Sequence, residues 1–160
     1  MKLSGGVEWA LHCCVVLSAA TEPTPATKLA EFHDVSPSYL AKHLQSLSGA
    51  GLIHSTQGKS GGYLLTRPAA EITVLQIVEA IDGTTPAFRC TEVRQRGPLA
   101  AAPENCTVPC GIARVMADAD RAWRESLNAV TVADLADDVN STVGPTTLTR
   151  VDRWLRTGAP

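Results

Sequence analysis

The alternation of apolar and polar positions at the start of the chain predicts two helices. Residues 7–20 are mostly apolar and follow a Ser-Gly-Gly segment, so we expect a buried first helix. Its neighbouring cysteines, Cys13 and Cys14, point about 100° apart on a helix and do not comfortably share one ligand. We therefore interpret both as small core residues. After a proline-containing break, residues 27–32 predict a short second helix.

A third helix follows after a tight turn. Ser36-Pro37 supplies a capping hydroxyl and a first-turn proline. Leu40, Leu44 and Leu47 recur at helical spacing and mark the buried face, and two glycines end the helix. Two helices joined by a short turn in this way are typical of a helix-turn-helix.

Two short segments after this motif predict a β-hairpin. Residues 52–55 and 63–66 are joined by the glycine-rich residues 56–62. A hairpin placed directly after a helix-turn-helix is a wing. Its glycines permit close backbone approach, and Lys59 supplies a positive charge for a phosphate.

The second half of the chain begins with a fourth predicted helix, residues 71–83, with Thr73 as its cap. Residues 84–109 hold four prolines and no period, which indicates an irregular loop. From Cys110 onward an apolar stripe runs to Val130, and such a long amphipathic helix suits dimerisation. The expected fold is mainly α with a small β-hairpin. It combines a winged helix-turn-helix domain (1–83), the loop (84–109), dimerisation helices (110–139) and a tail (140–160) that could form one more short helix.

Composition and charge narrow the functional classes. The chain has 160 residues and a formal net charge of −2, so any contact with DNA must come from a local patch. There is no signal-peptide pattern and no apolar run long enough to cross a membrane, from which we expect a cytoplasmic protein. Five cysteines without a secretion signal favour reduced, metal-bound or redox-active thiols over a disulfide framework.

Polar positions of the third helix and the wing tip are candidate contacts to double-stranded DNA. In a winged helix-turn-helix the second motif helix enters the major groove and the wing lies on the backbone or minor groove. The alternatives are a solvated polar face or a protein-interaction module, but a basic, glycine-rich wing tip in an acidic protein favours DNA. The candidates are Ser36, Ser38, Tyr39, Lys42, His43, Gln57 and Lys59.

Several segments together resemble one family of regulators. They are Leu40-Ala41-Lys42-His43-Leu44, Gly51-Leu52-Ile53, the wing from Gly58 to Leu65, and the helix from Ile72 to Ile81. Over about residues 1–139 the chain resembles the winged-helix iron–sulfur regulators typified by IscR and NsrR. The resemblance implies a homodimeric DNA-binding transcription factor, usually a repressor. It also implies a bound iron–sulfur cluster whose state sets the affinity for the operator.

The resemblance further implies which cysteines hold the cluster. Cys90 follows the fourth helix and Cys110 opens the dimer helix, which are the family's first and last cysteine positions. The family's three cysteines are closely spaced, whereas here fifteen residues separate Cys90 from Cys106 and three separate Cys106 from Cys110. We therefore take Cys90 and Cys110 as ligands and Cys106 as the reserve.

The remaining ligands are expected from the partner subunit. IscR-like members use a histidine where this chain has Ala113, but NsrR-like members use an acidic residue of the first helix, which corresponds to Glu8. A carboxylate inside an apolar helix is costly unless it is partnered or bound to metal; the alternative is an N-terminal glutamate facing the helix dipole. His33 is the second candidate, because neutral imidazole ligates iron; its alternative is a histidine in the dipole field of a helix C-terminus.

This ligand set leads to a redox hypothesis. Two thiolates, a carboxylate and an imidazole suit a [2Fe–2S] cluster better than a [4Fe–4S] cluster. Reduction would add negative charge beside His33 and Glu8. Trp9, adjacent to Glu8, is then a candidate switch residue, with plain packing as the alternative.

Two other readings stay open, and a third is disfavoured. Cys106 and Cys110 could contribute to a structural zinc site in a non-redox regulator. The same two thiols could form a disulfide as a metal-free thiol switch. An enzyme is not expected, because Gly58-Lys59-Ser60 lacks the full phosphate-loop pattern and lies on a hairpin.

Overall fold

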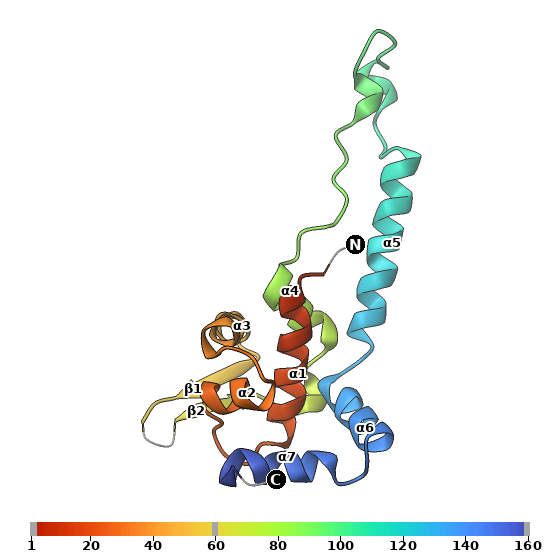
Figure 1. Ribbon diagram of the computed structural model, residues 1–160. Helices are drawn as coiled ribbons and strands as arrows, with labels where there is room; N and C mark the ends of the chain where they lie inside the picture. Colours follow the sequence, from red (N-terminus) through yellow and green to blue (C-terminus); the bar gives the residue numbers. More distant parts are fainter. Residues whose placement is uncertain (1–2, 59–60, 159–160) are drawn as a thin grey trace. The chain divides into compact units, whose positions relative to one another are not determined.

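The computed structural model describes residues 3–58 and 61–158, and this part of the chain contains seven α-helices and a two-stranded sheet (Figure 1). The mainly α fold with a small hairpin is as expected from the sequence. The residues form two compact units. The smaller is Thr84–Ser126, and the larger combines the residues before and after it. No helix in the described ranges has the length and apolar character that crossing a bilayer requires.

Helix α1 (Gly5–Ala19) lies in the core of the larger unit. It contacts α3 (Pro37–Gly49), α4 (Val74–Asp82), α6 (Val132–Thr142) and α7 (Thr147–Thr157). Cys13 and Cys14 on α1 are completely buried, and burial raises the pKa of the Cys13 thiol to about 12. Their interpretation as core residues is confirmed.

Capping side chains begin three helices where the sequence places them. The Ser36 hydroxyl accepts a hydrogen bond from the Tyr39 N–H at 3.2 Å and starts α3. Thr73 starts α4, and Thr131 starts α6 with Asp134 in a reciprocal capping box. Between α2 (Ala26–Phe32) and α3, Asp34 adopts a positive φ of 51°, a conformation that aspartate tolerates better than most residues and that makes the turn tight.

The wing is an antiparallel pair of β1 (Ile53–Thr56) and β2 (Gly62–Leu65). Ile53 pairs with Leu65 and Thr56 with Gly62. Thr24 adds a further bridge, because it exchanges backbone hydrogen bonds with Tyr63 at 2.8 and 3.0 Å. A Cβ atom on Gly62 would lie 2.4 Å from the Thr24 backbone, so only glycine fits there. Lys59 lies outside the described residues.

The smaller unit consists of an irregular loop and most of the long helix α5 (Gly111–Asn128). The loop contains two short 3₁₀ turns, Val93–Gln95 and Pro103–Asn105. None of the α5 residues is buried in the single chain, and Ile112 and Val115 are 69% and 65% exposed. In the larger unit, α7 is the short C-terminal helix that the sequence allows, and it buries Val151 and Leu155.

Candidate functional site

Cys90 and Cys110 come together within the smaller unit. Both are free thiols, Cys90 on the irregular loop and Cys110 directly before α5. The Cys90 thiol lies near enough to Cys110 to help lower the pKa of the Cys110 thiol. The two cysteines that the resemblance singles out are therefore neighbours, although nineteen residues lie between them in the sequence.

The surroundings of Cys110 favour its thiolate form. The Ala113 N–H in the first turn of α5 donates a hydrogen bond to the Cys110 sulfur at 3.4 Å. This bond, followed by the Cys90 thiol, the Ile112 N–H and the Arg94 guanidinium, outweighs partial desolvation and lowers the pKa of Cys110 below its ordinary value. A thiol with a lowered pKa is both a better metal ligand and a better nucleophile at neutral pH.

Arg94 ties the two limbs of the loop together. Its guanidinium donates to both oxygens of the Glu92 carboxylate, at 2.6 and 2.8 Å, and to the Val108 carbonyl at 2.8 Å. The pKa of Arg94 is raised chiefly by Glu92 and also by the nearby thiolates of Cys106 and Cys110. Cys106 therefore shares the neighbourhood of Cys110 in spite of the wide gap after Cys90. The sequence analysis did not predict a role for Arg94 near the cysteines. Its position between Cys90 and Cys106 is the one feature of the sequence that could have indicated this role.

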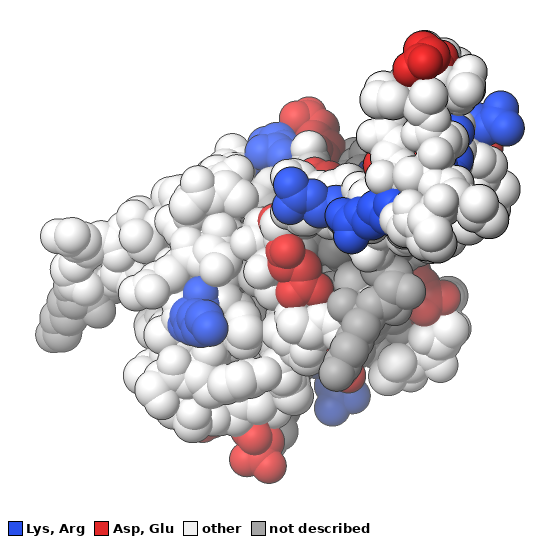
Figure 2. All heavy atoms as spheres, turned by 90° about the horizontal axis from the view of Figure 1, so that it is seen from above, with Lys and Arg blue, Asp and Glu red and all other residues white. Residues whose placement is uncertain are grey.

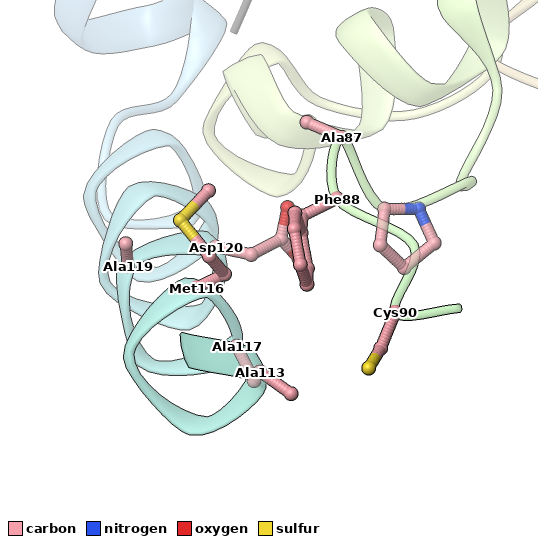
Figure 3. A pocket seen from close by; sticks show the side chains of 9 residues that line it. Ala87, Phe88, Cys90, Ala113, Met116, Ala117, Ala119 and Asp120 are labelled. Atoms are coloured by element: carbon pink, nitrogen blue, oxygen red, sulfur yellow. The ribbon is translucent and has the colours of Figure 1, made fainter. Parts of the chain in front are cut away.

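An apolar pocket of about 350 Å³ adjoins Cys90 (Figure 3). Phe88 and Cys90 line it from the loop, and Met116 and Asp120 are among the residues that line it from α5. One oxygen of Asp120 accepts a hydrogen bond from the Arg124 Nε at 2.8 Å, while the other is buried with no hydrogen-bond partner in the described residues. The pocket gives Cys90 a largely apolar surrounding on one side.

Glu8 and His33 belong to the larger unit. Glu8 lies in the first turn of α1 and is exposed, so the expectation of a costly carboxylate inside an apolar helix is wrong. The helix turns Glu8 outward while its neighbour Val7 enters the core. An exposed carboxylate at this end of α1 is free to meet another subunit, and it also faces the positive end of the helix dipole.

His33 follows the last residue of α2, and aromatic rings surround its imidazole. The ring centroids of Phe32, His12 and Trp9 lie 5.0, 6.0 and 6.1 Å from that of His33. Burial lowers the pKa of His33, and His12 lowers it further, which favours the neutral imidazole. Its Nε2 atom is buried with no hydrogen-bond partner in the described part of the chain. A neutral imidazole with an orphaned nitrogen has the form that a metal ligand needs.

The predicted cluster ligands are divided between the two units of the chain. In the described ranges of a single chain, no group of three His, Cys, Asp or Glu side chains is arranged to hold a metal ion. The smaller unit supplies adjacent thiols, Cys90 and Cys110, and the larger supplies His33 and the exposed Glu8. Clusters of the [2Fe–2S] type held by two thiolates and two imidazoles are known, and Glu8 in place of one imidazole is an expectation from the resemblance.

Most of the described DNA-binding candidates are exposed, but His43 is buried. Ser36, Ser38, Tyr39 and Lys42 on or beside α3, and Gln57 on the wing, are exposed. His43 is only 9% exposed and packs against Tyr39 and Gly6, so its expected place on the polar face is wrong. Residues 26–67 hold four basic and two acidic side chains, in contrast to the acidic chain as a whole. Figure 2 shows basic and acidic groups, separated by uncharged areas, on the face that it draws.

A match to a family model identifies the class of protein. Residues 3–138 match the Rrf2 family, described as iron-dependent transcriptional regulators, and the chain belongs to this family. The expectations of a transcriptional regulator, not an enzyme, and of the IscR-type family are thereby confirmed. Regulators of this family bind DNA and are dimeric.

Two relatives illustrate the similarity. YwgB of Bacillus subtilis, named as a candidate HTH-type transcriptional regulator, is 29% identical over 157 residues, which cover 97% of this chain and 95% of YwgB. The HTH-type transcriptional regulator IscR of Klebsiella pneumoniae is 37% identical over 76 residues, 48% of this chain and 47% of IscR.

Solved structures share the fold. CymR, the global cysteine regulator of B. subtilis, superimposes with a TM-score of 0.66 at 24% identity, covering 86% of this chain and 97% of CymR. IscR of T. potens superimposes with a TM-score of 0.64 at 22% identity. The match covers 87% of this chain and 88% of that IscR chain. The oxidised form of Staphylococcus aureus CymR superimposes with a TM-score of 0.62 at 25% identity. The match covers 85% of this chain and 96% of that CymR chain.

Proposed function

We propose that this Rrf2-family regulator is a homodimeric, DNA-binding redox sensor that acts as a repressor. Cys90 and Cys110 of one subunit, with Glu8 and His33 of its partner, would hold an iron–sulfur cluster, [2Fe–2S] in preference to [4Fe–4S]. The observation that carries the proposal is the proximity of the Cys90 and Cys110 side chains, together with the lowered pKa of Cys110. Cys106 remains the reserve ligand.

The cluster, when bound, would supply a one-electron redox centre. The protein would have to convert the change of charge at the cluster into a movement of the helix-turn-helix. His33 follows α2, the first helix of the helix-turn-helix, so its imidazole adjoins the turn into α3. Trp9 and Phe32 pack around that imidazole and would have to repack if it moved.

A second link runs from α1 to α3. Gly6, two residues before Glu8, lies against the His43 ring of α3 so closely that a Cβ atom there would be 2.4 Å from His43 Cε1. A displacement of the start of α1 is therefore passed to the recognition helix. In a dimer that reads two half-sites about one helical turn of DNA apart, such a shift changes operator affinity.

Anaerobic purification tests the proposal. Wild-type protein should be coloured, with visible absorbance and matching amounts of iron and sulfide. Cys90→Ala, Cys110→Ala, Glu8→Ala and His33→Ala should lose or alter that absorbance, while Cys106→Ala should keep it. Unchanged spectra for the Glu8 and His33 variants, with loss in the Cys106 variant, would reject this ligand set.

A metal-free thiol switch is the second candidate. The lowered pKa of Cys110 favours it, and one structural neighbour was solved in an oxidised form. Cys106 and Cys110 would lose two electrons and two protons to an oxidant such as a peroxide and form a disulfide. Colourless protein with a Cys106–Cys110 cross-linked peptide after peroxide treatment would favour this candidate over the cluster.

A further inference from the structure

A row of rings connects His33 to the C-terminal helix. The Phe32 ring meets His33 nearly at right angles, with centroids 5.0 Å apart, and Trp154 of α7 lies 5.5 Å from Phe32. Lys28 of α2 places its ammonium group 4.6 Å from the centre of the Trp154 ring. The row runs from α7, across α2, to the imidazole that we propose as a ligand.

Helix α7 is anchored firmly enough to serve as a support. Val151 and Leu155 are 9% and 7% exposed and join the hydrophobic core. The Asp152 carboxylate accepts hydrogen bonds from the Thr21 N–H and hydroxyl at 3.1 and 3.0 Å, after the end of α1. This helix lies beyond residue 138, where the match to the family model ends, so it is an addition to the part that defines the family.

The imidazole itself needs such a support. A histidine that ligates a metal is usually held in orientation by a hydrogen bond from its second ring nitrogen. The buried Nε2 of His33, the candidate ligand atom, has no hydrogen-bond partner in the described residues, and rings pack around the imidazole, so these rings determine its orientation. Phe32 is 36% exposed, so without Trp154 its ring would be free to take other rotamers.

From this arrangement we propose that Trp154 is a positioning residue for His33: acting through Phe32, it fixes the orientation of the imidazole and thereby ties α7 to the redox site. The inference rests on the proposed function for its consequence at the cluster, but the orientation of His33 can be measured without metal. The edge-to-face Phe32–His33 pair and the tilted Phe32–Trp154 pair are the aromatic contacts that would hold these side chains in defined orientations.

The test compares three variants of α7 in the 160-residue protein. Trp154→Ala removes the ring, Trp154→Phe keeps a ring, and Leu155→Ala weakens the anchoring of α7 without removing the ring that contacts Phe32. Nuclear magnetic resonance of ¹⁵N-histidine-labelled, metal-free protein reports the His33 imidazole, which is assigned by its absence in His33→Ala. Electron paramagnetic resonance and the rate of cluster loss in air report the metal site.

Trp154→Ala should shift the His33 imidazole signals, change the resonance of the reduced cluster and speed cluster loss about tenfold, a scale typical of losing a group that orients a metal ligand. Trp154→Phe should restore most of the wild-type behaviour, and Leu155→Ala should lower stability with smaller effects on His33. Wild-type His33 signals in Trp154→Ala, or equal shifts in Leu155→Ala, would overturn the inference. Wild-type protein that binds no iron would instead refute the proposed function and leave the metal-free comparison to decide the role of Trp154.

Discussion

Cys13 and Cys110 are the same side chain in opposite environments. Cys13 is fully buried in the core, and burial raises the pKa of its thiol to about 12. Cys110 sits at the start of α5, where a backbone N–H, the Cys90 thiol and Arg94 lower its pKa. The thiolate needed for metal binding or oxidation is therefore favoured at Cys110 and disfavoured at Cys13.

Alkylation of the metal-free, reduced protein tests this contrast. Iodoacetamide reacts with the thiolate, so the rate at Cys110 should reach half its maximum at a pH below that of an ordinary thiol and fall as pH drops through the lowered pKa. Cys13 and Cys14 should stay unmodified until the protein unfolds. Residue-resolved mass spectrometry over a pH series gives the rates. A Cys110 profile like that of a free thiol would contradict the account.

Some of these residues could be predicted from the sequence, and others could not. Cys13 and Cys14 were predictable because helix geometry places them in an apolar stretch. His43 could have been placed correctly: it follows Leu40 by three positions and precedes Leu47 by four, which puts it on the buried stripe. Arg94 was beyond prediction, because its partners Glu92 and Val108 meet it only through the folding of an irregular loop.

At the scale of elements, α1 and α3 are packed closely together in the larger unit. Gly6 meets the His43 ring there, and a methyl group would lie 2.4 Å from Cε1 and 2.7 Å from Nδ1. Ser4, just before α1, also bonds through its N–H to Asp82 at the end of α4, at 2.9 Å. The start of α1 is thus fixed against both the recognition helix and α4.

Two neighbouring alanine substitutions test this contact. Gly6→Ala should lower the free energy of unfolding by about 1–3 kcal/mol, the usual cost of overpacking, and weaken operator binding by displacing α3. Gly5→Ala is the matched control, since its nearest atom is the Tyr39 hydroxyl at 3.9 Å, and it should be neutral or slightly stabilising. Urea unfolding and DNA-binding titrations measure both. Equal stability of the two variants would contradict the close packing.

The helices themselves were largely predictable, whereas their packing was not. Ser36, Thr73 and Thr131 mark helix starts because a side-chain oxygen satisfies free N–H groups, and that signal is local. The position of α7 depends on distant residues such as Phe32 and Thr21, so the sequence could suggest the helix but not its place against α1 and α2.

On the scale of the whole molecule, α5 presents an apolar face that the single chain does not cover. Ile112, Val115 and Met116 are 69%, 65% and 38% exposed. An amphipathic helix with such a stripe is stable in water when it pairs with another apolar surface. A second copy of α5 is the partner that the proposed homodimer supplies.

Charge substitution on α5 tests the dimer. Val115→Asp should shift the protein from dimer to monomer in light-scattering measurements and abolish cluster retention, because a buried unpaired carboxylate is costly. Arg114→Asp, one residue away and exposed on the same helix, should leave the dimer intact. Dimers of unchanged mass in Val115→Asp would exclude this face as the interface.

A mixed dimer tests most directly whether the two subunits share the site. One subunit carries Cys90→Ala with Cys110→Ala, the other carries Glu8→Ala with His33→Ala, and different tags allow the heterodimer to be isolated anaerobically. Neither homodimer should hold a cluster. The heterodimer contains one complete intersubunit set of ligands, so it should bind half of the wild-type iron and sulfide. A heterodimer as empty as the two homodimers would contradict a site shared between subunits.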